Sequence, residues 1–555
     1  MPQRQGIGRS QMLMFCTDQQ IAADNPVRVI DAFVDALDLD ALGFVVKGRQ
    51  KTGSPAYSAA MLLKLYCYGY FNRIRSSRQF ELACQRNLEL WWLLEQQKPC
   101  YRTISSFRKD NKKALKKTFQ ALVQMCRSWG LYGAEIVAID GSKFRAQNSK
   151  KNNYNQKKID RHLEYIDKKT EEYLTALDRL DAVEEAEAKL LESIDNEADT
   201  SEQSTESAEL LQSLLVEKRE ELQNKLIQKE ESREKYENLQ SQLNEAFEKD
   251  QTRQISTTDP DARALPLKMN IVEVAYNLQT AVDAKHNLIV HYDVTNERDD
   301  YALADTAIAA RDALEVAILK ALADKGYNVG LELKRCAEAG ILTYVAIREN
   351  AASLKKGNYA KKHFVYSKET DSYTCPANQT LTSNGKWHER KSSGTRSHTY
   401  KMKVYKTSFH TCKNCPFAEQ CAGANNLKKS KGREIQRTEY DDYIEANRQR
   451  ITANKELYRR RQAIVEHPYG TIKRGWGYTY TLLRGKENVG GEFGLIATAY
   501  NLRRAMSILG VKDLIERLKS LKRGILLTFS AIFLFRSLTQ PLNRIFFRRI
   551  VVRHV

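Results

Sequence analysis

The stretch Glu135–Lys151, "EIVAIDGSKFRAQNSKK", decides the fold of the core. Its apolar run Ile136–Ile139 is typical of a buried strand, and Asp140 follows that run directly. A carboxylate at the end of such a strand costs free energy unless an arginine or a metal ion meets it. We therefore expect Asp140 to close the first strand of the core and to face a cation.

The charge around this stretch is unevenly distributed. The 555 residues carry a net charge of +20, yet residues 156–250 hold 27 acidic and 14 basic residues, a balance of −13. The remainder holds 75 basic and 42 acidic residues, a balance of +33. A remainder this basic most simply implies a polyanionic partner, because Lys and Arg that neutralise phosphates release counterions and so gain affinity. Charge alone is only a general signal for nucleic acid.

The order of predicted elements after the stretch indicates the fold. "AYNLQTAVDAKHNLIVHYDVT", residues 275–295, alternates as a β-hairpin that turns near 285–287. A helix over 302–314, a strand over 317–322, a helix over 329–339 and the strand "ILTYVAI" follow. With an insertion after the first strand and a last helix after an interruption, this order is that of an α/β, ribonuclease H-like fold with a mixed sheet.

The N-terminal part predicts an all-α domain. Helices are expected within 57–126, with Ser76 or Ser77 as one N-cap and another helix starting at Thr103. Their basic residues would line a phosphate-contacting surface, as in helix-turn-helix modules, but solvated faces of a helical bundle look the same by residue type. These residues are Arg73, Arg75, Arg78, Arg86, Arg102, Arg108, Lys109, Lys112 and Lys113.

The acidic insertion predicts a helical hairpin, in the manner of a coiled coil. Apolar residues recur at three-four spacing on both sides of the polar segment "NEADTSEQSTES". They are Ile159, Leu163, Ile166, Tyr173, Leu177 and Leu180 in the first helix, and Leu222, Leu226, Tyr236, Leu239, Leu243 and Phe247 in the second. We expect a protruding arm that contacts protein rather than DNA, because its exterior would repel phosphate.

These features divide the chain. We expect a helical domain over 1–130, a candidate for DNA binding, and an α/β core that begins with 131–155 and 266–350. The acidic hairpin and its linker occupy 156–265, a Cys-rich insertion occupies 351–450, and the final core helices occupy 451–510. A basic, apolar tail covers 511–555. Its apolar run Ile525–Phe535 is shorter than the roughly 20 residues that span a bilayer, so no membrane role is expected.

Three carboxylates form the predicted catalytic constellation. Asp324 follows the strand over 317–322, and in a mixed sheet of this order that strand can lie beside the one ending at Asp140. Paired hard oxygens favour Mg²⁺ or Mn²⁺, and Glu466 on a later helix would supply a third ligand. Glu492 is the strongest rival to Glu466. Other competing acids are Asp283, Asp293, Asp299 and Asp300.

Four of the ten cysteines form a separate pattern. Cys375 stands alone, and Cys412, Cys415 and Cys421 give C-x2-C-x5-C. In a protein without a visible signal peptide, a tight C-x2-C with two further cysteines more often indicates structural zinc than disulfides. Reduced thiols without metal are the alternative.

The chain resembles DDE-type transposases of bacterial insertion sequences, specifically the insertion sequence eleven-eighty-two group. The resemblance covers roughly residues 54–510 and is carried by "AIDGSKFRA", "TDPDAR", "YNLQTAVD", "ADKGYN", "RRQAIVEHPYGTIKR" and "ATAYNLRR" in this order. It implies that the catalytic acids are Asp140, Asp324 and Glu466. The Tyr, Arg, Glu, Lys signature of the related insertion-sequence-four group is matched by Tyr458, Arg461, Glu466 and Lys473, with one extra residue between Arg461 and Glu466. The expected DNA contacts are Lys143, Arg145, Tyr458, Arg461, Lys473 and Arg474.

The resemblance also implies a reaction and partners. Water and then a 3′-hydroxyl would attack a phosphodiester with two Mg²⁺ or Mn²⁺ ions bound, in a homo-oligomer, expected to be a dimer, that pairs two element ends. The rival interpretations are a metal-dependent nuclease without strand transfer and a non-catalytic, coiled-coil DNA-binding protein. A cytoplasmic, nucleoid-associated location is expected. The residues after Gly510 depart from the family.

Overall fold

The computed structural model describes residues 14, 16–45, 55–194, 202–250, 253–267, 271–347, 359–392, 398–421 and 430–521. They belong to two compact units. The body unit is drawn from Met1–Gln147, Ala275–Ser392 and His398–Val555, and the arm unit mainly from Asn148–Val274. Among the described helices, none is long and apolar enough to cross a bilayer. The run Ile525–Phe535 lies outside the described residues, and the predicted domain boundaries stay predictions.

The N-terminal part of the body unit is helical, as predicted. Its helices are η1 (Thr17–Gln20), α1 (Pro26–Asp35), α2 (Leu39–Leu42), α3 (Ala59–Phe71), α4 (Ser77–Arg86), α5 (Leu88–Leu93), α6 (Tyr101–Asp110) and α7 (Lys112–Ser128). Ser76 occupies the N-cap of α4, while α6 begins at Tyr101, two residues before the predicted start at Thr103. Cys100, with an extended backbone, is the N-cap that precedes this start.

A mixed sheet forms the centre of the body unit. Its strands are β1 (Ile136–Arg145), β5 (Val272–Asp283), β6 (Ile289–Thr295), β7 (Leu319–Ala323) and β8 (Ile341–Val345). The order is β6–β5–β1–β7–β8. β6, β5 and β1 pair antiparallel, whereas β1, β7 and β8 pair parallel. The α/β class and the mixed sheet are therefore confirmed.

Strand β1 is longer than predicted. Asp140 lies in its middle, because Gly141 to Arg145 continue the antiparallel pairing with β5. The parallel partner β7 pairs only as far as Ala138, which faces Leu322. Asp140 therefore marks the point where β7 has ended, and the expectation that it closes β1 is wrong.

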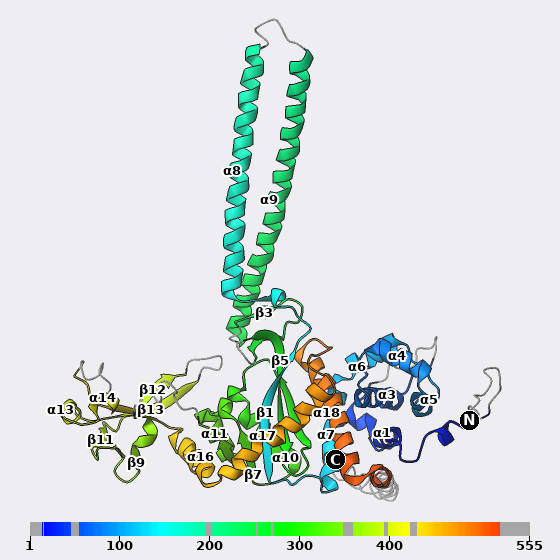
Figure 1. The fold of residues 1–555 in the computed structure, drawn as a ribbon, viewed down its shortest axis with the longest axis vertical. Helices are drawn as coiled ribbons and strands as arrows, with labels where there is room; N and C mark the ends of the chain where they lie inside the picture. The colour runs from blue at the N-terminus through cyan, green and yellow to red at the C-terminus, as the bar shows by residue number, and fades with distance from the viewer. Residues whose placement is uncertain are drawn as a thin grey trace, which may run out of the picture. The chain divides into compact units, whose positions relative to one another are not determined.

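Helices cover and complete this sheet. They are α10 (Leu303–Leu314), α11 (Gly330–Glu338), α16 (Asp441–Ala453), α17 (Lys455–Tyr469), the π-helix η7 (Gly470–Gly475) and α18 (Lys486–Leu509). α17 packs against β1 and β7, and α18 packs against α7 and α3 (Figure 1). Residues 511–521 are helical and bury Leu514 and Leu518. The core is thus joined to the N-terminal helices through α18.

The Cys-rich insertion contains a second sheet. Its strands are β9 (Val365–Ser367), β10 (Ser372–Thr374), β11 (Thr380–Ser383), β12 (His388–Lys391), β13 (Thr399–Lys406) and β14 (Glu434–Thr438). The order is β12–β13–β11–β10–β9, with β14 on β13. Short helices η6 (Lys361–His363), α13 (Phe409–Lys413) and α14 (Ala418–Cys421) accompany it. Buried aromatic and aliphatic residues, led by Tyr373, Leu381 and Tyr405, form its core.

The arm unit consists of two long helices that run side by side (Figure 1). These are α8 (Gln156–Ile194) and α9 (Glu202–Asp250). At their base, β2 (Asn153–Tyr154) pairs antiparallel with β3 (Ile255–Ser256), preceded by η2 (Lys150–Asn152). α9 begins inside the Ser-rich stretch predicted to separate the helices. Phe247, predicted for the seam, is 47% exposed, so the predicted apolar pattern overextends at this end.

Candidate active site

Two aspartates lie together at the edge where β7 ends. β1 and β7 pair in parallel as far as Ala138 and Leu322, so the same register continued by two residues places Asp140 beside Asp324. Asp324 is the N-cap of η5 (Lys325–Tyr327), and its Oδ1 accepts a hydrogen bond of 2.7 Å from Gly326 N. The strand pairing therefore brings both predicted carboxylates to one place.

The electrostatics of Asp140 reflect this neighbour. Burial raises the pKa of Asp140, and the Asp324 carboxylate raises it further, to about 6. The Arg461 guanidinium acts in the opposite direction, as does the 2.9 Å hydrogen bond from Gly141 N to Oδ1. The negative charge of the pair is therefore only partly offset, which is the setting that attracts a cation.

Helix α17 is fixed to the strand that carries Asp140. The Tyr469 hydroxyl donates to Asp140 O at 3.3 Å and to Leu278 O at 3.0 Å. It also lies 2.9 Å from Thr280 Oγ1, on the strand paired with β1. The sequence prediction did not identify Tyr469, for which the phrase "HPYG" at the end of a helix was the only signal.

Glu466 lies on α17 but is exposed to solvent. Its Oε1 accepts a hydrogen bond of 2.8 Å from Gln462 Nε2, one turn earlier. Within the described ranges, no three or more His, Cys, Asp or Glu side chains form a group that could hold a metal ion. The structure thus brings together Asp140, Asp324 and Arg461, and leaves Glu466 outside such a group.

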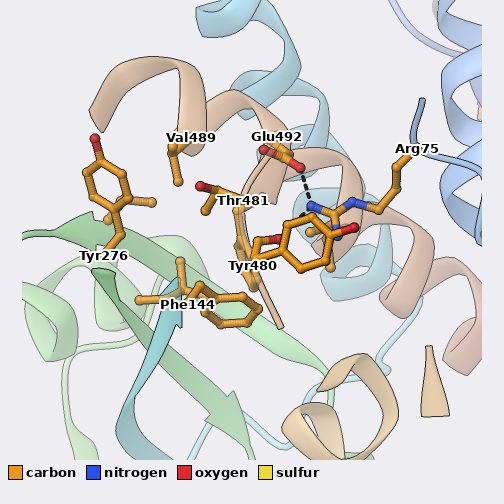
Figure 2. Close-up of a pocket in the computed structure, with 11 residues that line it drawn as sticks. Arg75, Phe144, Tyr276, Tyr480, Thr481, Val489 and Glu492 are labelled. Carbon is orange, nitrogen blue, oxygen red and sulfur yellow. Dashed lines mark hydrogen bonds and ion pairs between the residues drawn. The ribbon is translucent and has the colours of Figure 1, made fainter. Parts of the chain in front are cut away.

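Glu492, the rival to Glu466, is occupied by other partners. Its Oε1 lies 2.5 Å from Arg75 Nη2, and its Oε2 accepts hydrogen bonds from Leu482 N at 2.9 Å and Leu483 N at 3.1 Å. Arg75 also donates to Tyr480 O at 2.7 Å. Figure 2 shows this ion pair at one side of a small, mostly apolar pocket. The geometry assigns Glu492 to structure rather than to metal binding.

Two other competing acids also have partners in the fold. Asp283 is fully buried and accepts hydrogen bonds of 3.0 Å from Gly133 N and Ala134 N, which join it to the loop before β1. Asp293 is half-exposed and forms an ion pair of 3.1 Å with Lys116 on α7. Neither lies beside Asp140 in the strand register, so neither completes the pair.

Asp299 and Asp300 lie in the short helix η4 (Asp299–Tyr301), which follows β6. Lys143 Nζ contacts Asp299 Oδ2 at 2.7 Å, and the Lys143 side chain is only 17% exposed. The pKa of Asp299 is lowered because Lys143, Asn277 and Gln279 together outweigh the effect of burial. The predicted DNA contact Lys143 is therefore already paired with a carboxylate.

The remaining predicted DNA contacts differ in exposure. Arg145 and Arg474 are exposed, whereas Tyr458 is half-buried. Lys473 donates to Lys143 O at 2.6 Å and lies 4.3 Å above the Phe144 ring. The exposed arginines lie at the end of β1 and in η7.

Two of the N-terminal arginines cannot form the predicted phosphate surface. Arg75 and Arg108 are each 7% exposed, and Arg108 donates to Tyr70 Oη at 3.2 Å and to Arg75 O at 3.3 Å. Their burial depends on a partner from α18, about 400 residues away, which local sequence cannot reveal. Arg73, Arg78, Arg86, Arg102, Lys109 and Lys113 are exposed, and Lys112 pairs with Glu487.

The four cysteines predicted to bind zinc all carry free thiols. Cys375, Cys412, Cys415 and Cys421 are free cysteines. Cys375 Sγ accepts a hydrogen bond from Gln379 N, and Cys412 Sγ accepts one from Arg433 N, each at 3.3 Å. Burial raises the pKa of Cys421 to about 11; Arg433 lowers it, and the other three thiols raise it. The other three thiols therefore act electrostatically on Cys421, although among the described residues the four do not form a group that could hold a metal ion.

Comparison with known proteins identifies two regions. Residues 374–506 match the family described as "Transposase DDE domain", and residues 15–110 match the "Transposase domain (DUF772)". No curated protein and no solved structure matches the chain. The first match covers most of the predicted Cys-rich insertion, α17 and most of α18, while β1 and β7 lie outside both.

Proposed function

We propose that the chain is a DDE-type insertion-sequence transposase that cuts the ends of its element and joins them to target DNA, and its two matches to transposase domains support this. Neither family description specifies the insertion sequence eleven-eighty-two group, so that assignment remains part of the proposal. Transposases bind DNA, which agrees with the +33 balance outside residues 156–250. The sheet order β6–β5–β1–β7–β8 supports a ribonuclease H-like core.

The observation that carries the proposal is the pairing of Asp140 with Asp324. Two carboxylates whose mutual repulsion is only partly offset fit a divalent cation. Asp140 and Asp324 would hold it, and Glu466 is the proposed third ligand because it is an exposed carboxylate on the helix that crosses β1 and β7. When bound, two Mg²⁺ or Mn²⁺ ions would activate the attacking hydroxyl and stabilise the leaving oxygen.

The other residues of the site have proposed supporting roles. Arg461 offsets the charge of Asp140, and Tyr469 fixes α17 to the strand carrying it. Arg145 and Arg474 are exposed and would contact phosphate, and Tyr458 and Lys473 are the other proposed DNA contacts. The protein would act in the cytoplasm at the nucleoid, as at least a dimer that pairs two element ends.

The test uses DNA duplexes taken from both flanks of the gene, with Mg²⁺ or Mn²⁺ and a target plasmid. The proposal expects metal-dependent nicking at the repeat ends and joined products on gels. Nicking without joining would favour the nuclease interpretation. Binding without any nicking, under conditions in which the DNA ends are paired, would favour the architectural interpretation.

We also propose that the four cysteines hold one structural zinc ion. The support for this is the donor type: four thiols lie in one module and two already accept backbone N–H bonds. Zinc would have to draw the thiols together, because in the part of the chain that the structure describes they do not form a group that could hold a metal ion. Elemental analysis should find about one zinc per chain. The double variant Cys412→Ser, Cys415→Ser should lose it and destabilise the inserted module, whereas Cys336→Ser, elsewhere in the body unit, should retain it. Folded wild-type protein without zinc would contradict the proposal.

A further inference from the structure

The carboxylate of Asp299 gathers donors from two strands of the sheet. Its Oδ2 contacts Lys143 Nζ on β1 at 2.7 Å. Its Oδ1 accepts hydrogen bonds of 2.8 Å from Asn277 Nδ2 and from Gln279 Nε2, both on β5. Asn277 and Gln279 are fully buried, so their amides depend on these bonds. Asp299 therefore ties β1 to β5 through its charge.

The same network reaches the turn that holds Asp324. The Tyr327 hydroxyl donates to Gln279 Oε1 at 2.5 Å, and Tyr327 is fully buried. Tyr327 closes η5, the short helix whose N-cap is Asp324. Gln279 thus connects Asp299 on one side to the Asp324 turn on the other. A shift of Asp299 would be transmitted to that turn through one buried side chain.

The network also explains the glycine beside Asp140. A Cβ atom on Gly141 would lie 2.1 Å from Asp299 Oδ1 and 2.4 Å from Gln279 Nε2. Gly141 faces Gln279 in the β1–β5 register, so the network lies on the sheet face opposite to the Asp140 side chain. Asp299 therefore contacts β1 on the sheet face opposite to the Asp140 side chain, and both of its carboxylate oxygens already have hydrogen-bond or ion-pair partners.

We propose that Asp299 is a positioning residue that holds the Asp140 strand and the Asp324 turn in their common register, with Lys143 as its counterion rather than a DNA contact. This inference rests on the proposed function for its catalytic consequence. Its structural content, the coupling of two segments through Asp299 and Gln279, stands on the hydrogen bonds alone.

The first experiment measures hydrogen–deuterium exchange in the full chain with Asp299→Asn. Peptides covering 140–145 and 325–328 should both exchange at least about tenfold faster, because a charge-assisted hydrogen-bond network is lost. The matched control Asp312→Asn removes an exposed carboxylate with the same charge change and should leave both peptides unchanged. Lys143→Met removes the other member of the ion pair and should likewise accelerate exchange in the peptide covering 140–145.

Uniform acceleration in all peptides would mean that Asp299 supports global stability alone and would overturn the inference. So would unchanged exchange in the Asp324 turn. The double variant Asp299→Asn, Lys143→Met should exchange no faster than the more affected single variant, because both remove one interaction. Additive effects would likewise contradict the assigned pairing.

The second experiment separates positioning from DNA contact. Lys143→Met should bind one element end within about twofold of wild type, while cleavage at saturating DNA falls. A tenfold or greater loss of end affinity would return Lys143 to the DNA surface and overturn its assignment. Failure of the proposed function can be told apart from failure of this inference. In that case Asp140→Asn would keep the wild-type activity, whereas the exchange results would still decide the role of Asp299.

Discussion

In the Arg75–Glu492 pocket, the carboxylate meets a guanidinium at 2.5 Å and two backbone N–H groups (Figure 2). At the Asp140–Asp324 edge, burial and the Asp324 carboxylate raise the pKa of Asp140 to about 6, and Arg461 only partly offsets them. Both regions withdraw acids from water in the same unit. A carboxylate with cationic and N–H partners therefore indicates a structural role, whereas two carboxylates whose repulsion is only partly offset mark a candidate functional site.

The largest expected effect comes from removing an acid of the repelling pair. Asp140→Asn or Asp324→Asn should lower metal-dependent cleavage by about a thousandfold or more, because a metal ligand supplies several kcal/mol of transition-state stabilisation. DNA-end binding should stay near wild type in a mobility-shift titration. Asp312→Asn on α10 is the matched surface control. Cleavage at wild-type rates in either variant would remove the pair from the active site.

A second experiment disrupts the ion pair between Arg75 and Glu492. Glu492→Gln leaves Arg75 buried without a counter-charge and should lower the free energy of unfolding by about 3 to 5 kcal/mol. Urea unfolding measures this loss, with the exposed Glu487→Gln as control, for which less than about 1 kcal/mol is expected.

A second variant tests the cause of that loss. Adding Arg75→Met to Glu492→Gln removes the stranded charge while the amide oxygen can still accept from Leu482 N and Leu483 N. It should recover much of the lost stability. If it unfolds as readily as the single variant, packing rather than charge holds this pocket together.

The sequence predicts these two regions unequally. Asp140 and Asp324 could be found because each follows a short apolar run, and strand order places the runs side by side. The length of β1 could not, because Gly141 to Arg145 are polar and become strand only through pairing with β5. Arg75 and Glu492 could not be paired either, since 417 positions separate them. Local sequence patterns therefore predict strands and helices, whereas tertiary contacts determine which charged side chains pair with each other.

A smaller effect is expected when the pH is changed. The folded-state pKa of Asp140 lies above its ordinary value of 3.8, so ionisation costs stability as pH rises through 3.8 to about 6. Above pH 6 in the absence of metal, Asp140→Asn should therefore be more stable than wild type by about 1 to 3 kcal/mol. At pH 3.5 the difference should vanish. Unfolding at the two pH values measures it, and equal stabilities throughout would show that Asp140 carries no electrostatic cost.

The smallest expected effect concerns the arm unit, whose −13 balance contrasts with the basic remainder. Tyr154 pairs with Ile255 in β2–β3, so a short Gly/Ser linker can replace residues 156–250 without changing that register. Because acidic helices repel phosphate, affinity for one DNA end should change less than about twofold at fixed salt. Pairing of two ends should weaken, since exposed apolar residues such as Leu210 and Leu214 would be lost as contacts for a second subunit. A mobility-shift titration with one and with two ends separates these outcomes. If single-end affinity falls while pairing of bound ends persists, the arm contacts DNA despite its charge, and the basic body is not the sole phosphate surface.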